Sequence, residues 1–471
     1  MSNFNQPPNI DQIFKYRTNY GVNLGSLFVL ESWIYGDLFD KGGASELDAI
    51  RTQVKSSSVA ATAAKLAKHY NDYISSIAWD YLANKAGTTA LRVPIGYWHV
   101  NNGNFTKDTV FSEISAVYQA AKPWDILKRL IDKANSYQIG ILIDLHGLPG
   151  GANSAAHSGS INQPPTFFDN NKFKSLVIDN ILPFIVKDVC INKQNVIGLQ
   201  IVNEADFNEK AVNQKDYYIR AVSKIRNLQP TLPVIISDGW WPDQFSNWVK
   251  DNNLVSNVVI DTHIYRCYSD SDKSKNANQI ISELKDSINI PADGADFVVG
   301  EYSCVLDEQT WQKTSGDRGT IIKNFGLEQN RQFKIKSSWG WFFWTLQFKY
   351  GDGGEWGYIP QCEKGNIFLR VSNQNTIPVD QNRIESIIKD HINYWKDKGG
   401  DKMEHWRYID GIYKAAYDIQ AFQSFKNSSI GRWVSWTKLR RDHYVALKGN
   451  SAYMWEYDQG YARGLQEFNK R

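Results

Sequence analysis

Short apolar runs alternate along most of the chain with longer stretches of helical pattern. Eight runs, rich in β-branched residues, predict strands near 22–24, 89–95, 139–145, 196–202, 234–237, 258–262, 297–300 and 341–346. Between them lie amphipathic segments, such as the one in which Trp124, Leu127, Leu130 and Ile131 recur at helical spacing behind Pro123. Apolar strands alternating with amphipathic helices are typical of parallel sheets with right-handed crossovers. Eight such units favour an α/β fold of the (β/α)8 TIM-barrel type over an open doubly wound sheet.

Two segments exceed a minimal barrel. Residues 40–87 are rich in Ala, Ser and Lys, and their helical pattern predicts an enlarged connection before the second strand. Beyond residue 360 the strand–helix alternation stops. We therefore predict a barrel domain over residues 1–360 and a C-terminal helical extension over residues 361–471, packed on the barrel.

The predicted extension contains one local repeat. The pattern Trp406-x-Tyr408-x-x-Gly411-x-x-x-Ala415 matches Trp455-x-Tyr457-x-x-Gly460-x-x-x-Gly464. Small residues four positions apart on one helix face allow another backbone to approach closely. The repeat predicts two helices packed against the barrel or against each other, and a partner-binding face is the alternative.

Composition excludes several classes of protein. The 471 residues include 53 Lys and Arg against 50 Asp and Glu, which leaves a net charge of +3 and no polybasic face for nucleic acid or anionic membrane. No apolar run approaches the roughly 20 residues of a transmembrane helix. The N-terminal stretch has no apolar core of a signal peptide, so we expect a cytoplasmic protein.

Cysteine and histidine spacing gives no sign of a metal. The four cysteines form no CxxC pair and are expected to be buried thiols rather than disulfides or zinc ligands. The eight histidines include no HExxH or similar pair. By contrast, 17 Trp, 24 Tyr and 22 Phe are unusual, and besides filling a core they suit a site that stacks flat ligands such as sugar rings.

Polar residues stand where the predicted strands end, which is where a barrel of this kind gathers its chemistry. Each alone has a plain structural explanation, such as a helix cap, a hydrogen-bonded core histidine or an ion pair. Their joint occurrence at six strand ends favours an active site. They are Arg92 in the second strand, His146 after the third, Asn203 and Glu204 after the fourth, His263 and Tyr265 after the sixth, Glu301 after the seventh and Trp344 after the eighth.

Glu204 and Glu301 form the pair that can carry a reaction. Two carboxyls facing one cavity can divide into a protonated acid and an ionised nucleophile, and retaining glycosidases place them about 5–5.5 Å apart. Asn203 can donate to a sugar 2-hydroxyl, and Tyr265 can hold Glu301 in place. We expect a less polar setting and the nearby Glu301 to raise the pKa of Glu204, while Arg92 and Tyr265 favour ionised Glu301.

The sequence resembles glycoside hydrolase family 5, in the clan with its two glutamates after strands four and seven. It is most similar to the fungal exo-β-1,3-glucanase (glucan 1,3-β-glucosidase) branch, and to an intracellular offshoot of it. The matching stretches follow in order from about residue 20 to 360. They are GVNLGSLFVLESWI at 21–34, LRVPIGYWHV at 91–100, DLHGLPGGAN at 144–153, IVNEADFN at 201–208, DTHIYR at 261–266, VVGEYS at 298–303 and GWFFWTLQFK at 340–349.

The resemblance implies a site and a reaction. It implies Glu204 as acid/base and Glu301 as nucleophile of a double displacement, and no metal or organic cofactor. The residues that it places around the sugar are Glu31, Arg92, His146, Asn203, His263, Tyr265 and Trp344, with Trp356 stacking on that sugar or the next.

Two departures from the family pattern lie near the predicted site, and the second of them bears on substrate choice. Ala205 follows Glu204 where the family commonly has proline, and residues 155–158 read Ala-Ala-His-Ser where the exo-glucanases usually have an acidic–amide pair. We predict a retaining β-glycoside hydrolase that cleaves β-glucosidic bonds of a β-linked glucoside or oligosaccharide. The alternatives are a hydrolase of glucosylated lipid (steryl or ceramide β-glucoside) and a non-catalytic sugar-binding or scaffold protein.

Overall fold

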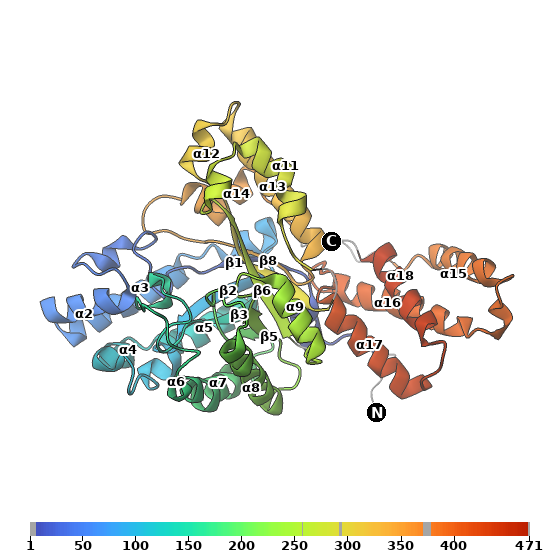
Figure 1. Ribbon diagram of the computed structural model, residues 1–471, viewed down its shortest axis with the longest axis horizontal. Helices are drawn as coiled ribbons and strands as arrows, with labels where there is room; N and C mark the ends of the chain where they lie inside the picture. The colour runs from blue at the N-terminus through green and yellow to red at the C-terminus, as the bar shows by residue number, and fades with distance from the viewer. Residues whose placement is uncertain (1–5, 257, 292–293, 371–377, 470–471) are drawn as a thin grey trace. The chain divides into compact units, whose positions relative to one another are not determined.

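The computed structural model describes residues 6–256, 258–291, 294–370 and 378–469, and the chain divides into two compact units (Figure 1). One unit is continuous, Asn19–Arg370. The other is discontinuous and joins Met1–Thr18 to Val371–Arg471. The sequence pattern places the division at residue 360. The continuous unit extends further because Cys362 and Ile367 are buried in its core. Packing of the C-terminal helices on the barrel stays a prediction.

The continuous unit is a closed barrel of parallel strands, paired in chain order from β1 to β8, with β8 beside β1. Every predicted strand is confirmed, and the barrel fold with them. The strands β6 and β7 run further than the sequence predicts, to Arg266 and Leu306. The strands are β1 (Asn19–Asn23), β2 (Ala90–Gly96), β3 (Gly140–Gly147), β4 (Val196–Gln200), β5 (Val234–Ser237), β6 (Val258–Arg266), β7 (Asp296–Leu306) and β8 (Gly340–Phe343).

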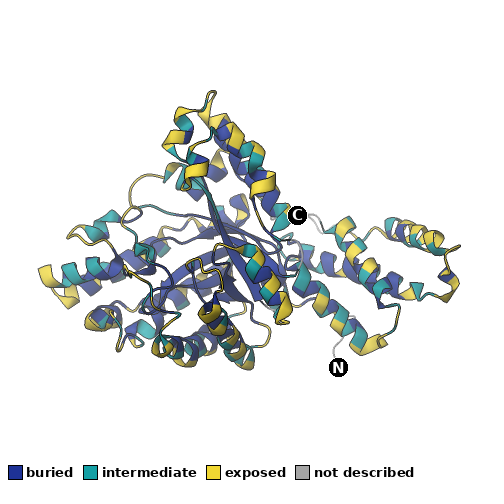
Figure 2. Cartoon of the chain, in the orientation of Figure 1, coloured by how far each residue is buried: buried dark blue, intermediate teal, exposed yellow. Residues whose placement is uncertain are grey.

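Helices surround this barrel, and their outer faces are exposed while the strands are buried (Figures 1 and 2). The predicted connection before β2 is helical. In order, the main helices are α2 (Glu46–Ser56), α3 (Val59–Ser75), α4 (Ser115–Ala121), α5 (Pro123–Ser136), α6 (Asn171–Leu176), α7 (Leu182–Ile185), α8 (Val212–Leu228), α9 (Pro242–Asp251), α10 (Asp270–Lys273), α11 (Ala277–Ser287), α12 (Glu308–Gln312), α13 (Arg318–Lys336) and α14 (Tyr358–Glu363).

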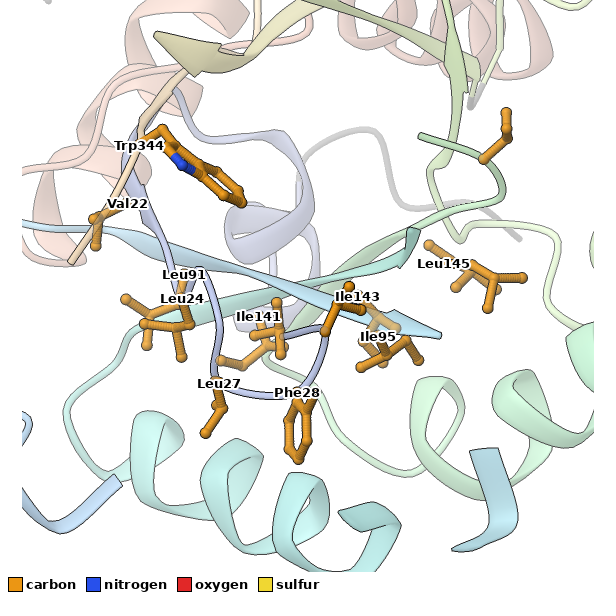
Figure 3. Close-up of a cluster of buried hydrophobic side chains, with 14 of the residues drawn as sticks. Val22, Leu24, Leu27, Phe28, Leu91, Ile95, Ile141, Ile143, Leu145 and Trp344 are labelled. Carbon is orange, nitrogen blue, oxygen red and sulfur yellow. The ribbon is translucent and has the colours of Figure 1, made fainter. Parts of the chain in front are cut away.

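Alternation along the strands separates the hydrophobic core from the chemistry. Figure 3 shows Leu91, Ile95, Ile141, Ile143 and Leu145, which occupy every second position of β2 and β3, in one buried cluster with neighbouring apolar side chains. Because successive strand residues point to opposite faces, the positions between them project into the barrel. On β2 and β3 those positions include Arg92 and His146, two of the polar residues predicted for the site.

The discontinuous unit contains α1 (Ile10–Tyr16), α15 (Gln381–Trp395), α16 (His405–Ser424), α17 (Trp433–Lys448) and α18 (Met454–Phe468). The sequence pattern assigns the N-terminal residues to the barrel, whereas Ile13 and Tyr16 pack in a core with Phe422, Ile430 and Trp436. Backbone contacts support the grouping, since Gly431 N donates to Tyr16 O over 2.7 Å and Thr18 N to Ser429 O over 2.9 Å.

The glycine repeat lies at the crossing of α16 and α18. A Cβ added at Gly411 would lie 2.5 Å from Tyr457 O, and one added at Gly460 would overlap Tyr408 O. The predicted close approach of two helices to each other is therefore confirmed.

We expect Gly411→Ala to lower the midpoint of thermal unfolding. Alanine favours a helix by up to about 1 kcal/mol over glycine, but forcing a methyl group against a packed backbone costs about 1–3 kcal/mol. Gly36→Ala is the control, because a Cβ at Gly36 meets no atom within 4 Å. Equal midpoints for wild type and Gly411→Ala in calorimetry would contradict the crossing.

Buried acidic groups in this unit have local partners. Asp418 is fully buried and pairs with Arg440 through two contacts of 2.7 and 2.8 Å. Glu456 is also fully buried, and its two oxygens lie 2.7 Å from His391 Nε2 and 3.0 Å from His405 Nδ1. Each Glu456 oxygen therefore has one imidazole partner, and hydrogen bonding explains why the two histidines and this carboxylate lie together.

The cysteines and the apolar character of the helices can be compared with what the composition predicts. All four cysteines are buried and none is in a disulfide, which confirms the prediction of buried thiols. Among the described residues, no helix combines the length and the apolar character needed to cross a membrane.

Candidate active site

A cavity of about 520 Å³ lies at the carboxyl ends of the barrel strands. Nearly all of the predicted site residues line it. The lining residues are Glu31, Trp33, His146, His157, Asn203, Glu204, Trp240, His263, Tyr265, Tyr268, Ser269, Glu301, Trp344 and Trp356. Another, more open groove of about 910 Å³ also contains Trp356. Two of its acidic residues already have structural roles, since Asp317 caps α13 and Glu355 pairs with Arg318.

Glu301 is held firmly at the base of this cavity. It lies on β7 beside His263 of β6, with which it is in register, and its side chain is only 7% exposed. Arg92 Nη1 donates to Oε1 over 2.8 Å, and the Tyr265 hydroxyl donates to Oε2 over 2.8 Å. A donor on each oxygen fixes the carboxylate's orientation.

Arg92 lies beneath the cavity rather than on its surface. The resemblance places it around the sugar, but its side chain is fully buried and does not line the cavity. Its guanidinium donates to Asn23, Gln200 and Asn203, and Asp144 lies 3.0 Å away. Burial opposes its charge, but the carboxylates of Asp144, Glu301 and Asp261 outweigh burial and raise its pKa above the ordinary value. Arg92 therefore organises the floor of the site.

The backbone at Glu204 is strained and specifically held. Its φ of 42° lies in the left-handed region, which costs a non-glycine residue about 1–3 kcal/mol. Asn153 Nδ2 donates to Glu204 O over 2.9 Å, and Ala205 N donates to the Ser237 hydroxyl over 3.2 Å. These contacts keep the turn after β4 in a conformation that aims the Glu204 side chain into the cavity.

Two imidazoles flank the Glu204 carboxylate. His263 Nδ1 lies 2.7 Å from Oε1, and His157 Nε2 lies 3.1 Å from Oε2. Burial raises the pKa of Glu204, but His157 and then His263 outweigh it and hold this pKa well below the ordinary value. The expectation of a raised pKa is therefore wrong, because it did not include the two histidines.

The two carboxylates come close together. One oxygen of Glu204, one of Glu301 and a ring nitrogen of His263 all lie within 4.8 Å of one another. Carboxyl groups about 5–5.5 Å apart suit direct attack on a sugar carbon, whereas separations of about 6.5–9.5 Å leave room for a water molecule. The separation of the Glu204 and Glu301 oxygens therefore falls in the shorter range, which suits direct attack.

Asn203 and His146 form a connected polar layer beside the carboxylates. Asn203 Oδ1 accepts from Arg92 over 2.7 Å, and its Nδ2 lies 3.2 Å from His146 Nε2. His146 Nδ1 in turn lies 2.6 Å from Asp144, and its ring stacks on Trp344 with 6.3 Å between centroids. These contacts hold Asn203, His146 and Trp344 together where they line the cavity.

The rim combines an acid with aromatic rings. Trp33 Nε1 donates to Glu31 over 2.8 Å, and burial raises the pKa of Glu31. Trp356 contacts both Trp33 and Tyr265, with ring centroids 5.3 and 5.7 Å apart. The predicted stacking residue therefore stands at the mouth of the cavity.

The structure adds lining residues that the sequence argument did not select. These are His157, Trp33, Trp240, Tyr268 and Ser269. Trp240 follows β5 and Tyr268 follows β6, so extending the strand-end search to every strand and to the loop residues beyond would have found both. His157 stands out in the sequence only as a departure from the exo-glucanase pattern.

We expect Tyr265→Phe to lower kcat/KM for an aryl β-glucoside by about ten- to a hundredfold, because a hydrogen bond to a charged group contributes about 1.5–3 kcal/mol. The matched control is Tyr268→Phe, which removes a hydroxyl from the same cavity that bonds to neither glutamate. Steady-state kinetics on both variants test this, and a similar loss in each would count against a specific role of Tyr265.

Comparisons with known proteins agree with these features. A family model for cellulase (glycosyl hydrolase family 5) matches residues 47–349. A second model, for the glucan 1,3-beta-glucosidase 3 C-terminal domain, matches residues 379–471. These two matches fall on the barrel and on the C-terminal helices respectively.

Individual relatives match over nearly the whole chain. An uncharacterized glycosyl hydrolase of Saccharomyces cerevisiae is 51% identical over 463 residues, 97% of this chain and 92% of that protein. Glucan 1,3-beta-glucosidase 3 of Schizosaccharomyces pombe is 30% identical over 465 residues, 96% of this chain and 95% of that protein. Among solved structures, a rutinosidase from Aspergillus niger superposes with a TM-score of 0.55 at 21% identity, covering 75% of this chain and 98% of that one. That likeness supports the barrel fold.

Proposed function

The chain belongs to glycosyl hydrolase family 5 and is a β-glycoside hydrolase, and from this premise we propose that its cavity cleaves β-glucosidic bonds by a double displacement with retention of configuration. The observation that carries the proposal is the separation of at most 4.8 Å between a Glu204 oxygen and a Glu301 oxygen. At that separation Glu301 can reach the sugar carbon directly.

In the first step Glu301 attacks the anomeric carbon as the bond to the departing oxygen breaks. Arg92 and Tyr265 hold its carboxylate in place for this attack. A proton passes from Glu204 to the departing oxygen, so the aglycone leaves as an alcohol. The sugar is then joined to Glu301 through an ester bond.

In the second step Glu204 takes a proton from water as the water oxygen attacks the anomeric carbon. The ester bond to Glu301 breaks, and the sugar leaves with its original configuration. Glu204 begins this half of the reaction as the carboxylate, which is the form that its low pKa favours.

Proton NMR of the first product tests the reaction class. The protein is incubated with an aryl β-glucoside, and the anomeric signal is followed before mutarotation. We expect β-glucose as the first product. α-Glucose would exclude the retaining mechanism, and no turnover of any β-glycoside would exclude the proposed activity.

A glucosylated lipid is a second candidate substrate, favoured by exposed aromatic rings around the cavity. Trp33, Trp240 and Tyr268 are 48%, 49% and 63% exposed. Rings exposed in this way suit a flat apolar aglycone as well as a second sugar. Initial rates on laminari-oligosaccharides and on steryl glucoside in detergent separate the candidates, since a preference of tenfold or more for one would assign the aglycone site.

We also propose a cytoplasmic location. Four buried cysteines without a disulfide suit a reducing compartment. Fractionation of cells that produce the tagged full-length chain tests this, and recovery of the protein in the medium would contradict it.

A further inference from the structure

The proposed reaction assigns no role to the imidazole of His157. It lies in the short turn Ala156–Ser158 after β3, and its side chain is 25% exposed at the cavity. Its Nε2 is 3.1 Å from Glu204 Oε2. Its Nδ1 is buried and has no hydrogen-bond partner among the described residues. Among the described residues, the His157 ring therefore makes its polar contact with Glu204.

The charges around His157 are mostly negative. Glu204 is in contact with it, and the carboxylates of Glu31 and Glu301, which line the same cavity, also act on it. The ring centroid of His146 lies 5.4 Å from that of His157, and His146 is hydrogen-bonded to Asp144. His263 contacts the other oxygen of the same Glu204 carboxylate. Burial disfavours a charged His157, but Glu204, Glu31 and Glu301 outweigh it and raise its pKa to about 9.

The other oxygen of Glu204 is already engaged. His263 holds Oε1 and is itself bound to Asp261 through its second nitrogen over 3.0 Å. A proton exchanged by Glu204 with a protein group on its Oε2 side must therefore pass to or from His157. We propose that His157 is a positioning residue that stores the proton which Glu204 delivers to the departing oxygen, and that it sets the upper pH limit of bond cleavage.

One proton moves between His157, Glu204 and the substrate in each cycle. In the free enzyme His157 is the cation and Glu204 the carboxylate. The Nε2 proton moves to Glu204 Oε2 and then to the departing oxygen as Glu301 bonds to the anomeric carbon. In the second step Glu204 takes a proton from water and returns it to His157. One water is consumed in each cycle, and both residues regain their first states.

This inference rests on the proposed retaining mechanism and adds a pH dependence to it. Without His157, a proton on the Oε2 side must reside on Glu204 itself, and a carboxyl group loses its proton several pH units below an imidazole with a pKa of about 9. His263 stays on the Oε1 side in both proteins, so it does not change between them. Substrates that need protonation of the departing oxygen should then fail at lower pH. Substrates with very good leaving groups should be affected much less.

The test measures kcat/KM against pH for wild type and His157→Gln, with methyl β-glucoside and 2,4-dinitrophenyl β-glucoside. For the methyl glucoside we expect the wild-type alkaline limb near pH 9. In His157→Gln we expect it at least about two pH units lower, which corresponds to roughly a hundredfold loss at the wild-type midpoint. For the dinitrophenyl glucoside we expect the two proteins to differ by less than about threefold, because its departing oxygen needs no proton.

His157→Lys is the matched variant that restores a cation without an imidazole. It should recover a high alkaline limb, whereas Gln keeps only a hydrogen-bond donor. Coincident alkaline limbs in wild type and His157→Gln would overturn the proposal, as would an equal loss on both substrates, which marks a structural role. If the wild type hydrolyses neither substrate, the proposed activity fails first.

A measurement on the wild type keeps the inference testable if a His157 variant does not fold. In protein labelled with [15N]histidine, Glu204→Gln should perturb the signals of both imidazoles that contact it, and the perturbed signal that is still present in His263→Gln belongs to His157. That signal should titrate near pH 9 in the wild type and at lower pH in Glu204→Gln. A midpoint at the ordinary histidine value in the wild type would overturn the proposal.

Discussion

Glu301→Ala is expected to lower kcat on an aryl β-glucoside by roughly 10⁴-fold or more, since the variant has no group that can form the glycosyl intermediate. The loss should extend to substrates with good leaving groups, because attack on the anomeric carbon is required whatever leaves. Arg92 loses one acceptor but keeps Asp144 at 3.0 Å, so we expect the barrel to fold.

Glu301→Gln is the control for this experiment. It keeps the size of the side chain and one acceptor for Arg92 but cannot act as a carboxylate nucleophile. Both variants should have circular dichroism spectra like that of the wild type and should lack activity. Retention of more than about a tenth of the wild-type kcat in folded Glu301→Gln would be incompatible with Glu301 as nucleophile.

Glu204→Ala should show a different pattern, which depends on the leaving group. We expect a loss of roughly 10²–10⁴-fold on glucosides with poor leaving groups, the usual contribution of general acid–base catalysis. A dinitrophenyl glucoside should still form the intermediate, which then accumulates because no base activates water. Sodium azide should restore turnover and give a β-glucosyl azide, since azide attacks the intermediate without giving up a proton.

The identity of the azide product decides the assignment of Glu204. A β-azide from Glu204→Ala indicates attack on an intermediate held by Glu301. An α-azide would mean that Glu204 is the nucleophile, so the two roles would have to be exchanged. Wild type with azide is the control, and it should release mainly glucose.

The sequence predicts the barrel and its central pair of carboxylates because both follow local rules. The strands are continuous apolar runs, and each glutamate directly follows or lies near the end of one. The chemistry around Glu204 could not be predicted in the same way. Its pKa depends on His157, which reaches it from a loop 47 positions earlier, and no periodic pattern relates the two residues.

Depth within the barrel is another property that the pattern does not show. Arg92 stands inside an apolar run, which indicates burial but not whether its charge faces the ligand. The structure shows it beneath the cavity because Asn23, Asn203 and Asp144 converge on it from three other parts of the barrel. Such convergence depends on strand register and closure rather than on neighbouring residues.

The discontinuous second unit has a consequence for synthesis of the chain on the ribosome. The helix α1 is made before the barrel strands, but its partners Ile430 and Trp436 are made more than 400 residues later. Every barrel strand is complete by Phe343, so the barrel can close while α1 is still without its core. A helix made before the barrel therefore completes its native contacts only after all the barrel strands have been made.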